Sequence, residues 1–350
     1  MVDRDNQYDH RTVSTPGGSR LASGLFTQNV IALIWDFDKT LVPGYMQEPI
    51  FKRFKVDENS FWDEVNGLAA FHRRSGLELV SKDSLYLNHI LTYVRHGLFG
   101  GLNNRMLREM GAEIVFYKGL PEFFGQVADA VRHNPRYAHH ELRVEHYVVS
   151  TGLRQLILGS KIAPYLEYVW ACEFVERTAP PGYLLREPVD GPPSEPGTLF
   201  GDADGIVDIG YVIDNTTKTR AIFEINKGTN VIPEIDVNSY VPHAERRVPF
   251  QNMIYVADGP SDVPVFSVVK QFGGKTFAVY RPGSKLAFQQ VNELQRQNRI
   301  DSFGEANYTP GSQASMWITN AVEEIADRIC ADRERALGER VGRAPQHLHD

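Results

Sequence analysis

Short apolar runs that end in polar or acidic residues constrain the fold of this chain more than any other feature. The clearest, VIALIWDF at residues 30–37, is continuously apolar up to its acid, and similar runs cover 144–152, 252–259 and 275–280. Such strands are buried on both faces, which is typical of a parallel sheet covered by helices. Segments with helical spacing of apolar residues separate the runs, so the sequence predicts an α/β fold.

The helical segments are expected both between the strands and in one long insert. Residues 44–113 show helical spacing of apolar side chains and few β-branched runs, so we interpret them as a helical insert after the first strand. Outside the insert, we expect helices over residues 116–133, 216–228 (with Gly228 as its stop) and 315–329, and a strand of a small antiparallel flap over 205–214.

These elements divide the chain into a core, the insert and two end segments. Residues 25–43 and 114–333 form the predicted core, and 44–113 form the insert. The composition of residues 1–24 and 334–350 predicts a disordered leader and a disordered tail.

Composition and charge argue against several classes of protein. The 350 residues are 42% apolar and 23% charged, which is typical of a globular protein with a sizeable core. A formal net charge of −7 without a Lys/Arg stripe argues against nucleic-acid binding. Two cysteines, Cys172 and Cys330, fit a reducing cytosol rather than a disulfide framework. Since no long apolar run or secretory signal is visible, we expect a cytoplasmic protein without membrane contact.

Two acids directly follow the first strand. Asp36 and Asp38 lie one residue apart in DFDKT, where the chain is expected to leave the strand, so that both can converge on one pocket. Two carboxylates held close repel each other, and a Mg²⁺ ion, which takes oxygen ligands from one or two carboxylates, would remove that repulsion. The alternative is a turn or helix N-cap in which Asp makes only local hydrogen bonds.

Two further groups could hold an anion. Ser150, Thr151 and Gly152 end the second strand, where a hydroxyl and backbone N–H groups can cradle phosphate oxygens, although a plain helix N-cap is the alternative. Lys218 begins a helix, where a cation opposes the helix dipole unless it faces an anion. Lys227, near the end of the same helix, suits the dipole and remains the competing lysine.

A second pair of acids follows the third strand. Asp258 and Asp262 lie in DGPSD, where Gly259 permits a tight turn, and an ordinary acidic turn is the alternative. Because the carboxyl ends of parallel strands meet at one sheet edge, we expect these acids to join Asp36 and Asp38 there. The four groups occurring together indicate a site for phosphate and Mg²⁺.

These four groups resemble the motifs of the haloacid dehalogenase (HAD) superfamily, which has DxDx[TV], a Ser or Thr, a Lys and a DxxxD-type motif in this order. The match covers residues 30–266 apart from the insert. The resemblance implies a Rossmann-like three-layer core around a parallel sheet, with the insert as a C1-type helical cap. The placement of the insert and the following KGLPEFF are similar to the phosphoserine phosphatase branch.

The resemblance implies a Mg²⁺-dependent phosphomonoester hydrolase that acts through an aspartyl-phosphate, with Asp36 as nucleophile and Asp38 as general acid and base. Its expected substrate is a small phosphorylated metabolite. Together with the reasoning from strand ends, it predicts phosphate binding by Thr40, Ser150, Thr151, Gly152 and Lys218, and Mg²⁺ binding by Asp36, Asp38, Asp258 and Asp262.

Some residues depart from that pattern. Lys39 replaces a small residue frequent in the first loop, and Tyr45 stands where phosphoserine phosphatases carry a substrate-reading Glu, with Glu48 further on. The leaving group is therefore open. Cap residues that could contact it are Tyr45, Glu48, Arg73 and Arg74, with hinges at Pro43-Gly44 and Lys118-Gly119.

Several alternatives stay open. The Pro- and Gly-rich segment 176–205 competes with the cap as the specificity element. A phosphotransferase or mutase would use the same aspartyl-phosphate, and a receiver-like phosphate-binding protein without turnover would use similar groups. The oligomeric state is open, homo-oligomer included. We interpret His139, His140 and His146 as surface or packing residues, and the aromatic residues Phe51, Phe54, Phe61, Trp62 and Phe71 as core of the cap.

Overall fold

The structure, a computed structural model, describes residues 28–179, 181–182, 205–232 and 234–341. At its centre is a seven-stranded sheet of order β4-β3-β2-β1-β5-β6-β7, which confirms the predicted α/β fold. Neighbouring strands run parallel, except that β3 and β4 are antiparallel. The strands are β1 (Val30–Trp35), β2 (Arg143–Leu153), β3 (Leu166–Val175), β4 (Asp208–Tyr211), β5 (Met253–Ala257), β6 (Lys275–Tyr280) and β7 (Ser302–Glu305).

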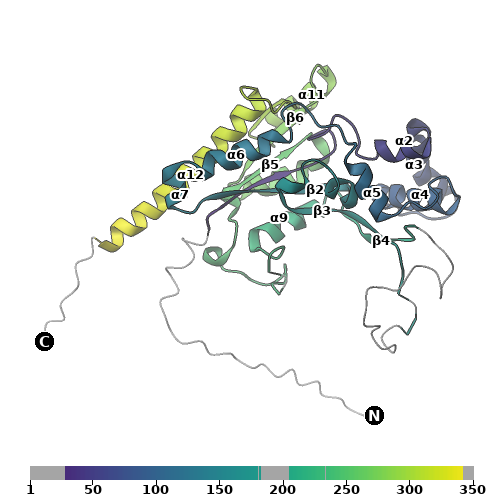
Figure 1. Ribbon diagram of the computed structural model, residues 1–350, viewed down its shortest axis with the longest axis horizontal. Coiled ribbons are helices and arrows are strands. Elements are labelled where there is room, and N and C mark those ends of the chain that lie inside the picture. Colours follow the sequence, from purple (N-terminus) through teal and green to yellow (C-terminus); the bar gives the residue numbers. More distant parts are fainter. Residues whose placement is uncertain (1–27, 180, 183–204, 233, 342–350) are drawn as a thin grey trace, which may run out of the picture.

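Helices cover both faces of the sheet. Figure 1 shows α6 (Glu122–Arg132) and α12 (Gln313–Val341) on one side and α9 (Lys218–Lys227) on the other, where α10 (Val263–Gln271) packs against it. All six residues of β1 are fully buried, as expected for the central strand. The remaining core helices are α7 (Pro135–His139), α8 (Arg154–Leu158) and α11 (Lys285–Arg296).

The insert after β1 is helical, as predicted. It contains α2 (Glu48–Phe54), α3 (Glu58–Arg74), α4 (Lys82–Arg95) and α5 (Asn104–Gly111). Figure 1 shows α2, α3 and α4 together at one end of the molecule, and α3 packs against α4.

The fourth helix of the insert is in direct contact with the core. Helix α5 packs against the core helix α8. A Cβ atom on Gly111 would lie 2.2 Å from the carbonyl oxygen of Leu156, and one on Gly159 would lie 1.7 Å from that of Arg108. Two glycines therefore allow the two backbones to touch, so the last helix of the insert lies directly against the core.

The C-terminal prediction needs correction. Residues 334–341 continue α12 instead of forming part of a disordered tail. Arg136 anchors this end of the helix, because its guanidinium lies 3.0 Å from the carboxylate of Asp327 and 3.1 Å from that of Glu334. The predicted leader, most of segment 176–205 and residues 342–350 lie outside the described residues.

The remaining comparisons with the sequence prediction concern the edge of the sheet and the elements that were not predicted. The expected antiparallel flap is β4, which pairs with the end of β3 at the edge of the main sheet. The predicted elements did not include β3, β7 and α11. In the part of the chain that the structure describes, no helix combines the length and apolar character needed to cross a bilayer.

Candidate active site

Asp36 and Asp258 follow neighbouring strands at the centre of the sheet. The chain moves from β1 outward through β2 and β3, and later returns to place β5 on the other side of β1. Ligands of parallel sheets bind where the order of strands switches in this way. Here the structure brings the acids together: carboxylate oxygens of Asp36, Asp258 and Asp262 all lie within 4.8 Å of one another.

A buried lysine joins two of these acids. The ammonium of Lys218 donates to Oδ1 of Asp36 and to Oδ1 of Asp262, each at 2.7 Å, and the lysine is only 2% exposed. Lys227 instead donates to the carbonyl oxygens of Val237 and Ser239, at 2.5 and 2.6 Å. Of the two candidate lysines, Lys218 therefore belongs to the acidic cluster.

Burial and mutual repulsion shift the pKa of each carboxyl. Burial raises the pKa of Asp36, the charge of Lys218 opposes this, and the charge of Asp262 adds to it. Burial raises the pKa of Asp258 to about 7, helped by the charges of Asp36 and Asp262. Burial alone would lower the pKa of Lys218, but the charges of Asp262 and Asp36 raise it. A cation added to this cluster would relieve an excess of negative charge.

Asp38 occupies a different position from the other acids. Its Oδ1 accepts a hydrogen bond from the backbone N–H of Met46 at 2.8 Å, and its carboxylate is not part of the group formed by the three other acids. Burial, followed by the charge of Asp36, raises the pKa of Asp38 to about 8. At neutral pH this carboxyl is therefore protonated and can donate a proton.

Thr40 orients the first acid. Its hydroxyl donates to Oδ2 of Asp36 at 2.9 Å, and its carbonyl oxygen accepts from the hydroxyl of Tyr308 at 2.7 Å. The Thr40 side chain is thus used within the loop, where it fixes the second oxygen of Asp36. Tyr308 was not predicted, because it lies far from Asp36 in sequence and no motif includes it.

Asp262 is held by residues that sequence reasoning missed. The hydroxyl of Tyr255 donates to its Oδ1 at 2.5 Å, and the hydroxyl of Ser261 donates to its Oδ2 at 2.8 Å. Tyr255 lies inside β5, where a tyrosine looks like one more apolar residue of a buried strand. The one clue in the sequence was the hydroxyl group of this tyrosine, since a buried Tyr hydroxyl normally needs a hydrogen-bond partner.

Two of the three residues at the end of β2 that were predicted to bind phosphate, Thr151 and Gly152, contact the insert. The hydroxyl of Ser150 accepts from the N–H of Gly152 at 3.0 Å, and the carbonyl oxygen of Thr151 accepts from Tyr86 at 2.6 Å. A Cβ atom on Gly152 would lie 2.2 Å from the Met46 side chain, so Met46 covers this turn. Within the described residues, no hydrogen bond links the three cradle residues to the acids.

Lys39 and Tyr45, the two residues that depart from the HAD pattern near the first acidic loop, contact each other. Lys39 has a positive φ of 60°, and its ammonium donates to the hydroxyl of Tyr45 at 2.8 Å. The ring of Tyr45 lies 5.3 Å from that of Trp62 in α3, measured between centroids. Lys39 and Tyr45 thus connect the acidic loop to the insert.

The remaining cap candidates lie at the surface. Glu48 forms an exposed ion pair with Lys52 at 2.6 Å, and Arg73 and Arg74 are exposed in the last turn of α3.

Among the histidines, His146 is a packing residue, as interpreted from the sequence. Its Nδ1 accepts from the indole N–H of Trp35 at 3.2 Å, and its ring packs against Phe124 at 4.6 Å between centroids. Burial lowers the pKa of His146 to about 3, so the ring is neutral.

The acidic cluster fits a divalent cation of the Mg²⁺ type. Carboxylate oxygens are hard ligands of the kind Mg²⁺ prefers, and three of them converge here. Asp258 makes no hydrogen bond within the described part of the chain, so its oxygens are available as ligands. Burial, followed by the charges of neighbouring acids, raises the pKa of Asp36 and of Asp258, and a bound cation would favour the ionised form of both carboxyls.

Comparison with other proteins places the chain in a family. No protein-family model matches it. An uncharacterized protein of Borreliella burgdorferi is 39% identical over 298 residues, which cover 84% of this chain and 97% of that protein. The chain belongs to the family of this Borreliella protein.

Solved structures similar to this family member include HAD hydrolases and phosphatases. A HAD family hydrolase from Salmonella enterica is 12% identical, with 80% of this chain and 68% of that chain covered and a TM-score of 0.44. A probable phosphoserine phosphatase from Vibrio cholerae is 11% identical, with coverages of 87% and 68% and a TM-score of 0.46. A phosphoserine phosphatase in a phospho-aspartyl analogue state is 14% identical, with coverages of 79% and 93% and a TM-score of 0.42. All three likenesses are weak.

Proposed function

We propose that this chain is a Mg²⁺-dependent phosphomonoester hydrolase of the HAD superfamily, with Asp36 as the nucleophile. The observation that carries the proposal is the buried bridge from Lys218 to Asp36 and Asp262 at the strand-order switch. A surface ion pair would not require three acids and a lysine at the ends of separate elements. The order of the four motifs along the chain supports the same reaction.

The proposed metal ligands are Asp36, Asp258 and Asp262, with the backbone carbonyl of Asp38 as a further candidate from the HAD resemblance. When bound, Mg²⁺ would neutralise charge on the phosphoryl oxygens. Lys218 provides a second, permanent positive charge beside the nucleophile. Both reduce the repulsion between a carboxylate nucleophile and a phosphate dianion.

In the proposed first step, a carboxylate oxygen of Asp36 attacks phosphorus. The bond from phosphorus to the leaving oxygen breaks as the Asp36 oxygen–phosphorus bond forms, and protonated Asp38 gives its proton to the leaving alkoxide. The hydrogen bond from Thr40 and the ion pair with Lys218 fix the direction of the Asp36 carboxylate. The products are a free alcohol and phosphorylated Asp36.

In the proposed second step, water attacks the phosphorus of that intermediate. Asp38, now ionised, takes a proton from the water, and the Asp36 oxygen–phosphorus bond breaks to release inorganic phosphate. Asp36 returns as a carboxylate and Asp38 as an acid, so one phosphoester and one water give one alcohol and one phosphate.

We further propose that the substrate is a small phosphorylated metabolite and that the insert selects its alcohol, as a C1-type cap would. The core groups contact only the phosphate and metal, which all phosphomonoesters share, so discrimination must come from groups beside the leaving oxygen. Tyr45 and Lys39 are the first candidates because they join the acidic loop to the insert.

Hydrolysis of p-nitrophenyl phosphate, with Mg²⁺ and with a chelator, tests the proposal. We expect turnover only with Mg²⁺, and loss of at least about 10³-fold in Asp36→Asn. The exposed Asp129→Asn, which removes only a surface contact to Arg132, is the matched control and should keep wild-type turnover. Mg²⁺-independent turnover, or an active Asp36→Asn variant, would contradict the proposal. Transfer of the phosphate to an alcohol in place of water would indicate a phosphotransferase. A stable phosphoprotein without turnover would indicate a receiver-like protein.

A further inference from the structure

Tyr308 lies where the two connections between the insert and the core meet. It is fully buried in the segment between β7 and α12. Its backbone N–H donates to the carbonyl oxygen of Lys118, which follows the insert, at 2.8 Å. Its hydroxyl donates to the carbonyl oxygen of Thr40, which precedes the insert, at 2.7 Å. One residue of the core therefore binds both connections of the insert.

The surroundings of Tyr308 hold its ring and its backbone in place. The ring packs against those of Trp35 and Phe123, with the centroids 5.8 Å apart in both pairs. Gly119 has a φ of +90°, and a Cβ atom there would lie 2.2 Å from the carbonyl carbon of Tyr308, so the two backbones touch. The residues predicted as the second hinge of the insert, Lys118-Gly119, are thus packed against Tyr308.

The hydroxyl of Tyr308 acts on the backbone of the nucleophile loop, which we define as residues 36–44. Within the described residues, the Thr40 carbonyl accepts no other hydrogen bond, so a buried acceptor would be left unpaired without this hydroxyl. The Thr40 side chain in turn donates to Oδ2 of Asp36 at 2.9 Å. Because the carbonyl and the side chain belong to one residue, the hydroxyl of Tyr308 helps to fix the position from which Oδ2 is held.

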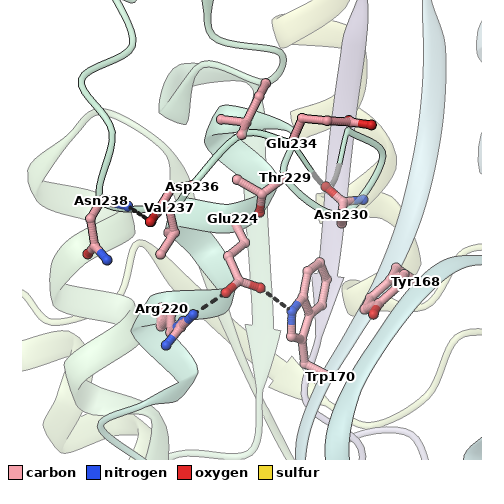
Figure 2. Close-up of a pocket in the computed structure, with 11 residues that line it drawn as sticks. Tyr168, Trp170, Arg220, Glu224, Thr229, Asn230, Glu234, Asp236, Val237 and Asn238 are labelled. Atoms are coloured by element: carbon pink, nitrogen blue, oxygen red, sulfur yellow. Dashed lines mark hydrogen bonds and ion pairs between the residues drawn. The ribbon is translucent and has the colours of Figure 1, made fainter. Parts of the chain in front are cut away.

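The other oxygen of Asp36 is held independently of Tyr308. Its Oδ1 accepts from Lys218, at the start of α9, at 2.7 Å. Helix α9 is tied to β3, since the indole N–H of Trp170 donates to Glu224 at 2.6 Å beside the surface pocket shown in Figure 2. The orientation of the Asp36 carboxylate is therefore set from two sides, by α9 and by the loop that Tyr308 anchors.

We infer that Tyr308 is a positioning residue for Asp36, an inference that rests on the proposed function. Its hydroxyl, through the carbonyl of Thr40, holds the nucleophile loop in the orientation for attack on phosphorus. Reacting groups must be held to within about 0.5 Å of their productive geometry, and the residues behind them supply much of that order. Loss of the hydroxyl should therefore slow the reaction more than it weakens substrate binding.

Hydrogen exchange followed by mass spectrometry tests the contact without any turnover. Tyr308→Phe keeps the ring and the backbone bonds and removes only the hydroxyl. The N–H of Leu41 donates to the Phe37 carbonyl within the loop at 2.8 Å. In metal-free Tyr308→Phe we expect this amide to exchange about tenfold faster than in wild type. The control Tyr137→Phe, which removes a hydroxyl that donates to Asp327 at 3.1 Å, should leave the loop unchanged. Equal exchange of the loop in wild type and Tyr308→Phe would overturn the inference.

Steady-state hydrolysis of p-nitrophenyl phosphate tests the effect on Asp36. We expect kcat to fall about tenfold in Tyr308→Phe, with KM within about twofold of wild type, and both to be unchanged in Tyr137→Phe. Thr40→Val removes the hydrogen bond to Asp36, so the two substitutions together should lower kcat by less than the product of their separate effects.

The possible failures of this experiment are distinguishable. A wild type without turnover would overturn the proposed function, and the positioning role of Tyr308 with it. A wild type with turnover and a Tyr308→Phe variant with unchanged kcat would overturn the positioning role alone. A Tyr308→Phe variant that unfolds at a lower temperature but keeps its kcat per folded molecule would do the same, because the hydroxyl would then serve only the fold.

Discussion

Single carboxyl groups at the candidate active site make the stability of the metal-free protein depend on pH. The pKa of Asp258 rises from 3.8 to about 7 on folding, and that of Asp38 from 3.8 to about 8. A carboxyl with a raised folded-state pKa stabilises the fold below its unfolded pKa, and this contribution is lost as pH rises through the folded pKa. Metal-free protein should therefore lose stability between about pH 4 and pH 8.

Thermal unfolding with chelator at pH 6 and pH 8 measures this loss. We expect the midpoint to fall by at least about 2 °C as Asp258 and Asp38 ionise without a cation. Mg²⁺ should reverse the fall at pH 8, and Asp258→Asn should reduce both the pH effect and the gain from Mg²⁺. If the midpoint were the same at both pH values and in Asp258→Asn, the pKa values of these carboxyls would not be raised in the folded protein.

Two lysines on the same helix allow a matched test of the cation in the cluster. Lys218→Met removes the ammonium between Asp36 and Asp262, so we expect loss of hydrolysis by at least about 10²-fold and of about 3 kcal/mol or more of folding free energy. Lys227→Met removes only bonds to the carbonyls of Val237 and Ser239. Steady-state rates and denaturant unfolding compare the two, and a larger loss of activity in Lys227→Met would reverse the assignment.

At the scale of secondary-structure elements, the close packing of α5 on α8 depends on glycine. A methyl group on Gly111 would lie 2.2 Å from the carbonyl oxygen of Leu156, a backbone atom that cannot rotate away. Gly111→Ala should therefore destabilise the protein by about 1–3 kcal/mol or more in urea unfolding.

The matched control is Gly67→Ala, in the middle of α3. A Cβ atom there meets nothing within 4 Å, so the change should stabilise the helix by about 0.5–1 kcal/mol. Equal effects of the two substitutions would mean that α5 does not lie against α8 as described.

At the scale of the whole molecule, we expect the insert to choose among phosphoesters while the core performs the reaction. Tyr45→Phe removes the hydroxyl that binds Lys39 and should change the ratio of kcat/KM between two phosphoesters with different alcohols. The Mg²⁺ requirement should persist. A ratio unchanged in Tyr45→Phe but altered by substitutions in segment 176–205 would assign specificity to that segment.

The sequence predicted those parts of the molecule that depend on local pattern. Continuous apolar runs predicted β1, β2, β5 and β6, and the acids at two of their ends predicted where Asp36 and Asp258 meet. Lys218 was suggested because a cation opposes the dipole at a helix start. These inferences need only neighbours in sequence and the rule that parallel strands end at one edge.

Contacts between distant segments were not predictable in the same way. Tyr255 and Tyr308 look like core residues in sequence, yet their hydroxyls hold Asp262 and the loop of Asp36. Met46 covers Gly152 because the insert folds back onto β2, which no local pattern specifies. Strand β3 was missed because polar residues such as Glu167 and Glu173 interrupt its apolar pattern.

The central claim is that Asp36 carries the phosphoryl group. Acid quenching during turnover of p-nitrophenyl phosphate, followed by borohydride reduction and peptide mass spectrometry, locates the modified residue. The Asp38→Asn variant should accumulate more of the phosphorylated intermediate, since it lacks the base that speeds its hydrolysis. We predict reduction of an acyl phosphate at Asp36 alone, with Mg²⁺ present and not with chelator. Turnover with no modification at Asp36, or with modification at another residue, would contradict the account.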